Sequence, residues 1–362
     1  MYAGFDPDVP IESAWTPPAR WYVDREVHED ERRRVWAKTW QVVGRRDQLT
    51  RPGSYFAGTF MDEGYVVVRG EDGKIRAFFN TCRHHAAQVA TGESCATKFV
   101  CPYHGWTYAL DGTLKSAPRM GAVRDFERDA FGLVPMSVAI WGPLVAIKLQ
   151  KATTPDHDPI HAPELEAALV ATQWSELRFF ARRVYEVACN WKVYVDNYLD
   201  GGYHVNVLHG DLASQLDLDS YRTQIHTNSV VQSCRGGTGE PKGLDFRERL
   251  GDGAVYGWLY PNFMINRYGP LMDTNLVIPV DENRCRVIFD YFCDPSLATD
   301  QDFLERSLNA SETVQREDEE ICASVQSGLR SAAYDRGRYA PKLEAGAHHF
   351  HRLLAADLSP ES

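Results

Sequence analysis

Apolar and polar residues alternate with a period of two along much of the first half of the chain, starting at Trp40. The alternating runs lie at 41–44, 54–57, 65–69 and 75–79, and a further run follows at 144–149. Turn signals containing Pro, Gly, Asp or Glu separate the first runs, at 51–53, 63–64 and 72–73. Such a pattern is typical of short strands, so this region is predicted to be a small antiparallel β domain.

The pattern changes after a polar, Pro-containing stretch at 151–163, which predicts a domain boundary. Beyond it, strands are expected at 178–187, 223–233, 255–267, 274–279 and 286–291. Helical spacing of apolar residues predicts helices at 190–204 and 300–329, and another near the N-terminus at 24–38. The predicted fold class is α+β. An arm at 1–38 precedes a small all-β domain at 39–150 and a larger domain at 151–362, in which helices cover an antiparallel sheet.

The composition narrows the classes of function. The chain has 362 residues, of which 44% are hydrophobic and 25% charged, as in an ordinary globular protein. The net charge of −11 argues against a nucleic-acid partner, because no basic stripe is present to neutralise phosphates. No apolar segment approaches 18 residues and no signal peptide is evident, so no membrane association and a cytoplasmic location are predicted. The eight cysteines are not spaced as a disulfide framework.

Two short motifs in the β domain give the strongest chemical signal. Cys82 and His84 form a C-x-H pair, and Cys101 and His104 form a C-x-x-H pair after sixteen intervening residues. In a Rieske centre, two cysteines bind one iron of a [2Fe–2S] cluster and two histidines bind the other. Zinc is the alternative, but zinc fingers usually keep both cysteines in one half and both histidines in the other. The mixed halves favour a Rieske cluster.

A second metal site is predicted in the larger domain. His204 and His209 follow the expected helix at 190–204, and two histidines with one carboxylate form the facial triad of non-haem Fe(II) oxygenases. Taken alone, two histidines near a helix end are more often ordinary surface or core residues. The cluster motif changes this weighting, because an electron-delivering centre needs a redox acceptor.

The carboxylate of this triad is expected from the acidic run at 317–320. Most acidic runs are solvent-exposed helix faces. Asp318 keeps helical spacing with the apolar residues Ile321 and Val325, so its side chain is expected to point with the apolar face. A buried carboxylate needs a counter-charge or a metal. Asp318 is therefore preferred to Glu317 as the third ligand.

Together the two metal motifs resemble those of the oxygenase component (α subunit) of Rieske non-haem iron oxygenases. The resemblance covers the chain from about Trp21 to Leu354. Three longer stretches, at 196–205, 216–221 and 260–270, resemble the choline monooxygenase-like branch of this family. The resemblance implies a small all-β Rieske domain followed by a larger, helix-grip-like catalytic domain.

The resemblance also implies a reaction and its partners. A reductase or a ferredoxin, supplied indirectly by NAD(P)H, reduces the cluster, and the electron passes to a mononuclear Fe(II) that activates O₂. Transfer is expected within a homotrimer, from His104 of one chain to His204 of the next through a bridging carboxylate. That carboxylate commonly stands three residues before the first iron-binding histidine, where this chain has Gly201. The role is therefore assigned to Asp200, with Asp196 as the alternative.

The implied reaction is the monooxygenation of a small quaternary ammonium compound such as choline or a betaine. Such a cation binds best against aromatic faces. Tyr256, Trp258 and Tyr260 alternate along one expected strand and so share a face. The residues expected to contact the substrate are Tyr203, Trp258, Tyr260 and Tyr268, and Tyr198 is a further aromatic nearby in the sequence. Packing in a sheet core explains these aromatics equally well.

Two other functions stay open at this point. An aromatic ring-hydroxylating dioxygenase or an oxidative demethylase would use the same metal sites and similar aromatic walls. An electron-transfer protein with a Rieske domain and a catalytically silent second domain is a different class, and the pair His204 and His209 argues against it.

Overall fold

The computed structural model describes residues 4–152, 160–238 and 247–359, which form two compact units. One unit combines the N-terminal segment ending at Val35 with the chain from Ala162 onward. The other runs from Trp36 to His161. The N-terminal arm therefore packs with the second half of the chain, although the β domain follows it directly in sequence.

The unit from Trp36 to His161 is built on a seven-stranded antiparallel sheet with the strand order β1-β10-β9-β4-β3-β2-β5. Its strands are β1 (Trp40–Arg45), β2 (Ser54–Phe60), β3 (Glu63–Arg69), β4 (Ile75–Phe79), β5 (Glu93–Cys95), β9 (Pro135–Trp141) and β10 (Leu144–Lys151). Short 3-10 turns occur at η2 (Arg46–Leu49) and η3 (Arg128–Phe131). Each alternating run expected from the sequence lies within one of these strands.

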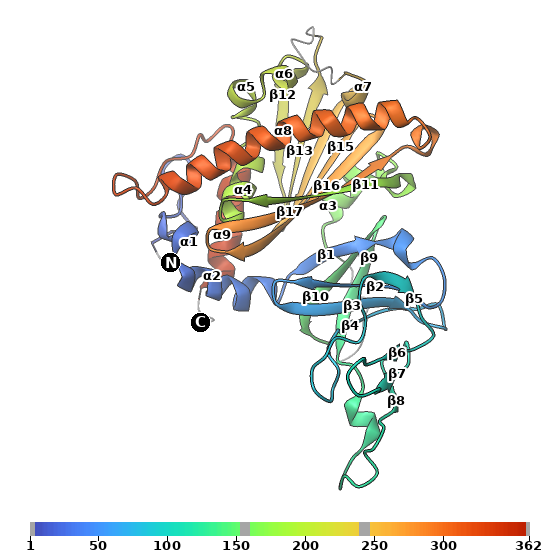
Figure 1. The fold of residues 1–362 in the computed structure, drawn as a ribbon. Helices are drawn as coiled ribbons and strands as arrows, with labels where there is room; N and C mark the ends of the chain where they lie inside the picture. The colour runs from blue at the N-terminus through green and yellow to red at the C-terminus, as the bar shows by residue number, and fades with distance from the viewer. Residues whose placement is uncertain (1–3, 153–159, 239–246, 360–362) are drawn as a thin grey trace. The chain divides into compact units, whose positions relative to one another are not determined.

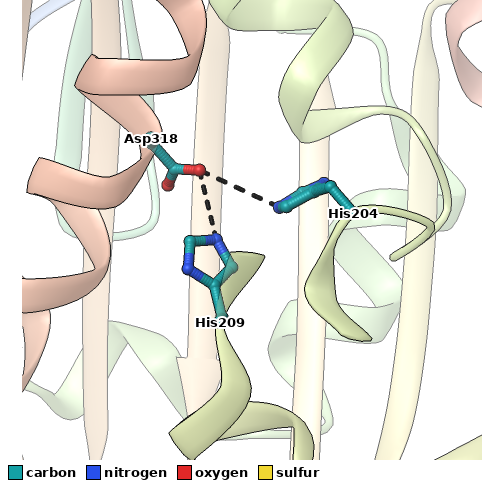
Figure 2. Close-up of side chains that lie close together, drawn as sticks. All are labelled: His204, His209 and Asp318. Atoms are coloured by element: carbon teal, nitrogen blue, oxygen red, sulfur yellow. Dashed lines mark hydrogen bonds and ion pairs between the residues drawn. The ribbon is translucent and has the colours of Figure 1, made fainter. Parts of the chain in front are cut away.

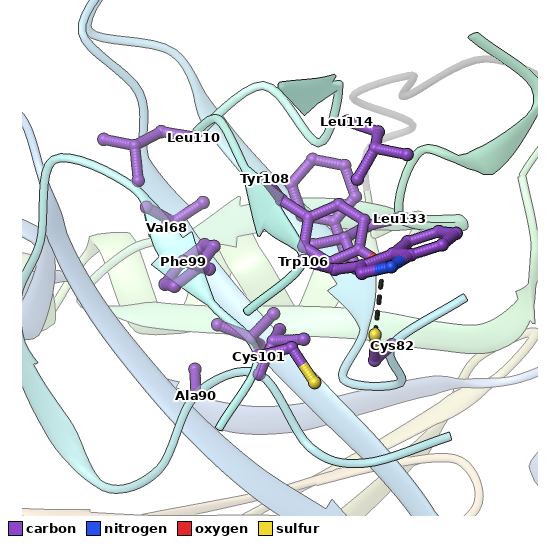
Figure 3. Packing of buried hydrophobic residues seen from close by; sticks show 13 residues of the cluster. Val68, Cys82, Ala90, Phe99, Cys101, Trp106, Tyr108, Leu110, Leu114 and Leu133 are labelled. Carbon is purple, nitrogen blue, oxygen red and sulfur yellow. Dashed lines mark hydrogen bonds between the residues drawn. The ribbon is translucent and has the colours of Figure 1, made fainter. Parts of the chain in front are cut away.

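A second, three-stranded sheet of the same unit holds the cluster motifs in its connections. Its strands are β6 (Phe99–Val100), β7 (Thr107–Tyr108) and β8 (Leu114–Ser116). Val68 of β3, Phe99 of β6 and Tyr108 of β7 belong to one buried apolar cluster (Figure 3). Because both sheets contribute to this cluster, burial of apolar side chains fixes the small sheet against the larger one.

The unit that combines the N-terminal segment with the chain from Ala162 onward contains a second seven-stranded antiparallel sheet. Its strand order is β11-β17-β16-β15-β14-β13-β12. Its strands are β11 (Arg178–Val187), β12 (Leu216–Ile225), β13 (Ser229–Gly236), β14 (Gly253–Leu259), β15 (Phe263–Tyr268), β16 (Leu271–Asp281) and β17 (Arg284–Cys293). From β12 to β17 each strand pairs with the next one in sequence, and β11 is added beside β17. Alternate residues of these strands therefore line up across the sheet, which places side chains from several strands on one face.

Two strand predictions need correction. The runs expected as single strands at 223–233 and 255–267 are each two strands of a hairpin, divided at 226–228 and 260–262. The backbone N–H of His226 donates to Ser229 O at 2.9 Å, and that of Tyr260 donates to Asn228 O at 2.9 Å. The sequence hides these turns because His226 and Tyr260 continue the alternation of side chains.

The main helices of this unit are α4 (Trp191–Tyr198), α8 (Gln301–Gly328) and α9 (Ala345–Leu358). Figure 1 shows α8 running across one face of the sheet that contains β12 to β17. Its start is capped by Asp300, whose side chain accepts a hydrogen bond from Phe303 N at 3.0 Å. The shorter segments are α3 (Pro163–Val170), α5 (Val205–Leu208), α6 (Gly210–Ala213), α7 (Arg247–Leu250), η4 (Trp174–Glu176) and η5 (Pro295–Leu297).

The N-terminal arm consists of α1 (Arg20–Val23), α2 (Arg25–Glu31) and a π-helical turn, η1 (Arg32–Trp36), where the sequence predicted one helix at 24–38. A buried ion pair joins the arm to α4. Lys192 Nζ lies 2.5 Å from Glu31 Oε1, and Trp191 Nε1 donates to Glu31 Oε2 at 2.7 Å. Removing one member would leave the other charge buried without its partner, which typically costs about 3–5 kcal/mol.

Within the described ranges, none of the helices has the length and apolar character needed to cross a membrane.

Candidate metal centres and active-site cavity

A turn after α4 positions the first candidate iron ligand. The sequence predicted a helix up to residue 204, but α4 ends at Tyr198 and two glycines follow with left-handed backbone angles, φ +70° at Gly201 and +78° at Gly202. A Cβ at position 201 would lie 2.2 Å from Leu343 O. This position therefore cannot carry an acidic side chain, and the nearest carboxylate before His204 belongs to Asp200.

Asp200 holds the turn in place through four hydrogen bonds. Its Oδ1 accepts from Gly202 N at 2.9 Å and from Tyr203 N at 3.1 Å. Its Oδ2 accepts from His204 N at 2.9 Å and lies 2.7 Å from His204 Nδ1. A carboxylate offers about four lone-pair sites. Asp200 therefore uses all of them within its own chain, and a further donor could bind only by displacing one of these contacts.

The three predicted iron ligands lie together in the structure (Figure 2). Asp318 of α8 places its Oδ1 3.2 Å from His209 Nε2 and 3.8 Å from His204 Nε2. The potential ligand atoms all lie within 4.8 Å of one another. Residues from the turn after α4, from the end of α5 and from the middle of α8 thus meet at one point.

A carboxylate stands behind each histidine. Asp200 contacts Nδ1 of His204, and Glu317 Oε2 lies 2.6 Å from His209 Nδ1. A carboxylate at Nδ1 fixes the ring orientation and tautomer, and it leaves Nε2 free to bind a metal. Asn197 Nδ2 also donates to Asp318 Oδ1 at 2.8 Å, which orients the third ligand.

The donor set fits a ferrous ion. Two imidazole nitrogens and one carboxylate oxygen form the ligand set that leaves coordination positions open for O₂ and substrate. Burial lowers the pKa of His209, but hydrogen bonds and charges from Asp318 and Glu317 outweigh this effect and raise the pKa above its ordinary value. The position between the three side chains therefore attracts positive charge.

The buried face of the helix predicted around Asp318 needs correction. Ile321 and Val325 were expected to mark the buried face of the helix, but they are exposed, with 39% and 44% of their surface accessible. From Ser307 onward, the buried side of α8 carries small, polar and thiol side chains instead. These residues are Ser307, Ala310, Ser311, Gln315, Cys322 and Gln326. Asp318 is half-buried and lies one turn from Gln315 and from Cys322, at the edge of that side.

Asp196, the alternative to Asp200, has a different environment. Its Oδ2 accepts a hydrogen bond from Tyr22 OH at 2.7 Å, and its Oδ1 lies 2.8 Å from His351 Nε2. His351 Nδ1 in turn lies 2.7 Å from Tyr339 OH. Asp196 thus connects α4 to the N-terminal arm and to α9, whereas Asp200 contacts His204.

The candidate cluster ligands are gathered in the other unit. Cys82 and Cys101 are buried in the apolar cluster of Figure 3, at 2% and 3% exposure, and His84 and His104 have ring centroids 4.6 Å apart. The His84 ring stacks on Trp106 at 4.9 Å. Its Nδ1 is buried and has no hydrogen-bond partner among the described residues. A buried nitrogen beside two buried sulfurs fits a cluster with mixed sulfur and nitrogen ligands.

A cavity of about 150 Å³ adjoins the histidine–carboxylate group. Its wall includes the three candidate iron ligands and five tyrosine rings. The rings are those of Tyr194, Tyr198, Tyr221, Tyr256 and Tyr268. Its other polar lining residues include Gln232, Arg249, Asn266, Asp273 and Asn275.

The prediction of substrate contacts needs correction. Tyr268 lines the cavity, but Tyr203, Trp258 and Tyr260 are not part of its wall within the described chain. Trp258 is fully buried and its ring packs on Phe350 of α9 at 5.6 Å. Tyr260 donates to Asp357 Oδ2 at 2.8 Å, and Tyr203 is 57% exposed. Trp258 and Tyr260 alternate with Tyr256 along the chain as predicted. However, both contact residues of α9, Trp258 through Phe350 and Tyr260 through Asp357, and neither lines the cavity.

Several residues of the site gave no separate signal in the sequence. The sequence offered Glu317 only as an alternative metal ligand, but its carboxylate contacts His209 Nδ1. Tyr221, Arg249 and Asp273 were not selected, because they come from separate elements and no short motif connects them. Only the fold of the whole unit brings them to one cavity.

Comparison with known proteins agrees with both metal centres. Residues 39–127 match the Rieske [2Fe–2S] domain, and residues 174–359 match the catalytic domain of the ring-hydroxylating α subunit. The chain belongs to the Rieske non-haem iron oxygenases. It is an oxygenase (α) subunit, and the choline monooxygenase-like branch contains relatives that match it along nearly its whole length.

Relatives of this oxygenase subunit include a chloroplastic choline monooxygenase of Arabidopsis thaliana, 47% identical over 98% of this chain and 85% of the relative. The carnitine monooxygenase oxygenase subunit of Escherichia coli K12 is 32% identical over 95% of this chain and 94% of its own. The quaternary ammonium Rieske monooxygenase CntA, solved with L-carnitine, superposes with a TM-score of 0.82 at 29% identity, covering 99% of both chains. The naphthalene 1,2-dioxygenase of Rhodococcus shares the fold, with a TM-score of 0.77 at 20% identity.

Membership in the family decides between the alternatives for the two sites. The subunit is an enzyme that uses a Rieske [2Fe–2S] cluster, a mononuclear iron and O₂, so zinc in the first site and a silent second domain are both set aside. It acts on a small molecule and receives electrons from a donor partner.

Proposed function

We propose that this oxygenase subunit monooxygenates a small quaternary ammonium compound. The observation that carries the proposal is the row of tyrosine rings beside the histidine–carboxylate group. Tyr221 and Tyr256 stack with centroids 6.3 Å apart at 14°, and Tyr256 meets Tyr268 edge-on at 6.2 Å and 73°. Aromatic faces attract a methylated ammonium group that cannot donate hydrogen bonds. Relatives named as choline and carnitine monooxygenases support this substrate class.

The tyrosine rings are held firmly enough to form a binding wall. Tyr198 OH donates to Asn266 Oδ1 at 2.9 Å, and Tyr268 OH donates to Asp273 Oδ2 at 2.6 Å. Burial raises the pKa of Tyr198, Tyr256 and Tyr268, so these phenols stay neutral. A neutral, fixed ring presents its face to a cation without requiring reorganisation on binding.

Under this proposal the site residues have distinct roles. His204, His209 and Asp318 would hold the iron, which supplies O₂ activation when bound. Asp200 and Glu317 orient the two imidazoles. In the other unit, two cysteines and two histidines would hold the cluster. These are Cys82, His84, Cys101 and His104. A reductase or a ferredoxin would deliver electrons derived from NAD(P)H to the cluster.

We also propose a homotrimer in which electrons pass between chains. For CntA, inter-subunit electron transfer is described. In this chain, a cavity of about 240 Å³ on the other side of Asp200 is bordered by exposed apolar residues that a neighbouring chain would cover. They are Ile321, Val325 and Tyr334. Asp200 would reach a neighbour's His104 only by giving up one of its four contacts, so its first role is to orient His204.

Light scattering on the metal-replete protein tests the assembly. A trimer requires a mass about three times the 41.0 kDa of one chain. A monomer that turns over substrate at the full rate would remove the inter-subunit route.

A cytoplasmic location belongs to the proposal as well. None of the eight cysteines forms a disulfide, which suits a reducing compartment. A fluorescent fusion in the native host tests it, and a signal confined to another compartment would contradict it.

A substrate screen tests the reaction. The purified subunit, supplied with a generic reductase–ferredoxin pair, NADH and O₂, is incubated with choline, glycine betaine, carnitine or a benzoate-like acid. We expect product from at least one quaternary amine, measured by mass spectrometry, because oxygen uptake alone can be uncoupled from hydroxylation. Turnover of the aromatic acid with no turnover of any cation would instead establish ring hydroxylation or demethylation.

A further inference from the structure

One wall of the active-site cavity contains a buried ion pair, Arg249 of α7 and Asp273 of β16. Arg249 Nη2 lies 2.6 Å from Asp273 Oδ2, and the two residues are 7% and 1% exposed. An arginine in such a place would ordinarily be the residue that binds a substrate carboxylate, because its planar fork matches carboxylate geometry. The surroundings of Arg249 determine whether it is available for this task.

Arg249 is fully engaged at its two terminal nitrogens. Nη1 donates to Ser307 O at 2.7 Å and to Ser307 Oγ at 2.8 Å. Nη2 donates to Asp273 Oδ2 at 2.6 Å and to Tyr268 OH at 2.9 Å. The guanidinium also stacks on the Tyr268 ring at 4.7 Å. All four terminal hydrogens therefore have acceptors, and the paired fork is not free to bind a ligand.

Asp273 is ionised and neutralises this arginine. Its Oδ2 accepts from Arg249 and from Tyr268 OH, and its Oδ1 accepts from Asn266 Nδ2 at 2.7 Å. Guanidinium and amide N–H groups can only donate, so both carboxyl oxygens are used as acceptors. Burial raises the pKa of Asp273 above its ordinary value, although the facing guanidinium and these hydrogen bonds act in the opposite direction. Because the guanidinium and amide groups beside it can only donate, this arrangement of hydrogen bonds requires the charged form of Asp273.

The other charged side chains that line the cavity offer a substrate carboxylate no cationic partner. Apart from the two iron-binding histidines, Arg249 is the one cationic side chain that lines the cavity within the described residues. Asp200 and Asp318 are the other charged lining residues, and both are acidic. A substrate carboxylate would therefore be desolvated beside Asp273 without a free cation, which is unfavourable.

A neutral oxygen, in contrast, finds a donor in the same wall. Asn275 lies two residues after Asp273 on β16, so both side chains face the cavity. Asn275 Oδ1 accepts from Asn266 Nδ2 at 2.8 Å, which orients the amide. Its Nδ2 is buried and has no partner within the described part of the chain. An unpartnered buried donor in a cavity wall suits a substrate hydroxyl or carbonyl oxygen.

We infer that Asp273, by occupying Arg249, makes this cavity select quaternary ammonium compounds that carry a neutral polar group and reject those that carry a carboxylate. The inference rests on the proposed function and adds to it a specificity-determining pair. Specificity of this kind comes from the unpaired charge of the wrong ligand as much as from contacts to the right one.

The test compares choline with glycine betaine, which share a trimethylammonium group on a two-carbon chain and differ in hydroxyl against carboxylate. Binding is measured by calorimetry on the metal-replete protein, so the readout does not depend on turnover. The wild type is expected to bind choline at least about tenfold more tightly than betaine. Betaine methyl ester, which lacks the negative charge, is expected to bind measurably more tightly than betaine.

The variant Asp273→Asn keeps the shape of the side chain and releases the charge of Arg249. It is expected to raise betaine binding relative to choline binding at least about tenfold. The double variant Arg249→Met with Asp273→Asn removes both charges and should not gain betaine binding. Asp290→Asn is the matched control, because Asp290 of the neighbouring β17 also pairs with an arginine, Arg182, but lies outside the cavity wall.

The outcomes separate the inference from the function it rests on. Equal binding of choline and betaine by the wild type overturns the inference and leaves the substrate class intact. Binding of no quaternary amine overturns the proposed function and the inference with it. If Asp273→Asn does not fold, the wild-type comparison with betaine and its methyl ester decides. A folded Asp273→Asn protein without improved betaine binding contradicts the role of the pair.

Discussion

The two metal-binding regions of this protein are built in opposite ways. All four proposed cluster ligands lie from Cys82 to His104, in the loops around two short strands, and left-handed residues at Ala86 (φ +62°) and Gly105 (φ +74°) shape these loops. The proposed iron ligands lie from His204 to Asp318, on elements that meet only because the catalytic-side unit folds. This is the unit that combines the N-terminal segment with the chain from Ala162 onward. The cluster site is formed by neighbouring loops that pack on an apolar core, whereas the iron site forms only when distant segments of its unit fold together.

The contacts that hold the ligand side chains in place also differ between the two sites. Among the cluster ligands the sulfurs are packed in an apolar core, while His104 is exposed. In the iron site each histidine is instead fixed by a carboxylate, Asp200 or Glu317. We expect mutations near the cluster to act through packing, and those near the iron to act through hydrogen bonds.

The largest expected effect comes from removing one ligand from each centre in turn. Asp318→Ala should reduce the iron content from about three to about two per chain and leave the spectrum of the cluster unchanged. Activity should fall by more than about 100-fold, beyond the 10–100-fold that is typical of outer-shell changes. Cys101→Ser should do the reverse, with the cluster signal lost and about one iron retained. Metal analysis and electron paramagnetic resonance measure both.

Glu320→Ala is the matched control for Asp318→Ala, because it removes an exposed carboxylate from the same acidic run and should leave metal content unchanged. In the proposed trimer, co-expression of the two inactive variants would place an intact cluster beside an intact iron site of another chain. Recovered activity is expected. Should Cys101→Ser also empty the iron site, the two centres would not be independent and the comparison would fail.

The same contrast explains what the sequence could predict. The proposed cluster ligands were predicted from spacing alone, since four ligands within one short segment are constrained by local backbone geometry. His204 and His209 are also near each other, but their partner Asp318 was chosen with the wrong neighbours, Ile321 and Val325, which are exposed. Polar side chains such as Ser311 and Gln315 are buried on α8 where they line the cavity, and an apolar pattern in the sequence cannot reveal this.

The cavity was the least predictable part. The alternation correctly placed Tyr256 and Trp258 on one strand, whereas Tyr260 lies in the turn after β14. Helix α9 packs on Trp258, while Tyr256 lines the cavity. Which end of a strand is covered depends on a helix that follows about ninety residues later in the sequence. Likewise, Arg249 of α7 and Asp273 of β16 meet only when the unit folds, and no local spacing in the sequence gives a signal for this contact.

An intermediate effect is expected from the carboxylates behind the iron ligands. Asp200→Asn keeps an oxygen for the backbone N–H groups but loses the negative charge at His204 Nδ1. Iron affinity or kcat/KM should fall by about 10–100-fold. Glu317→Gln should have a smaller effect, about tenfold or less, since the Glu317 side chain is 36% exposed and water can replace part of its contact.

Asp196→Asn provides the contrast to Asp200→Asn. Asp196 contacts Tyr22 and His351 instead of an iron ligand, so its loss should lower the melting temperature without changing iron affinity. Iron titration followed by differential scanning calorimetry separates the two effects. Equal loss of iron affinity in both variants would show that Asp196 takes part in holding the iron.

The smallest expected effect is a difference between the two units in how their stability depends on pH. His348 of α9 is buried in the catalytic-side unit, and burial, together with His351 and Arg352, lowers its pKa to about 4. Its Nε2 has no hydrogen-bond partner in the part of the chain that the structure describes. The unfolded chain binds this proton with a pKa of about 6.5. Stability is therefore complete above about pH 6.5, is lost as the pH falls from there to about 4, and changes no further below that value.

After allowance for screening by solvent, the loss amounts to about 1–2 kcal/mol. The melting transition of the catalytic-side unit should fall by a few degrees between pH 7 and pH 5, and His348→Gln should reduce this shift. Part of it should remain, because burial also lowers the pKa of His349. Transitions recorded by calorimetry for the wild type and for His348→Gln check the sign. A shift of equal size in both proteins would mean that other groups, such as the exposed histidines of the cluster loops, control acid stability.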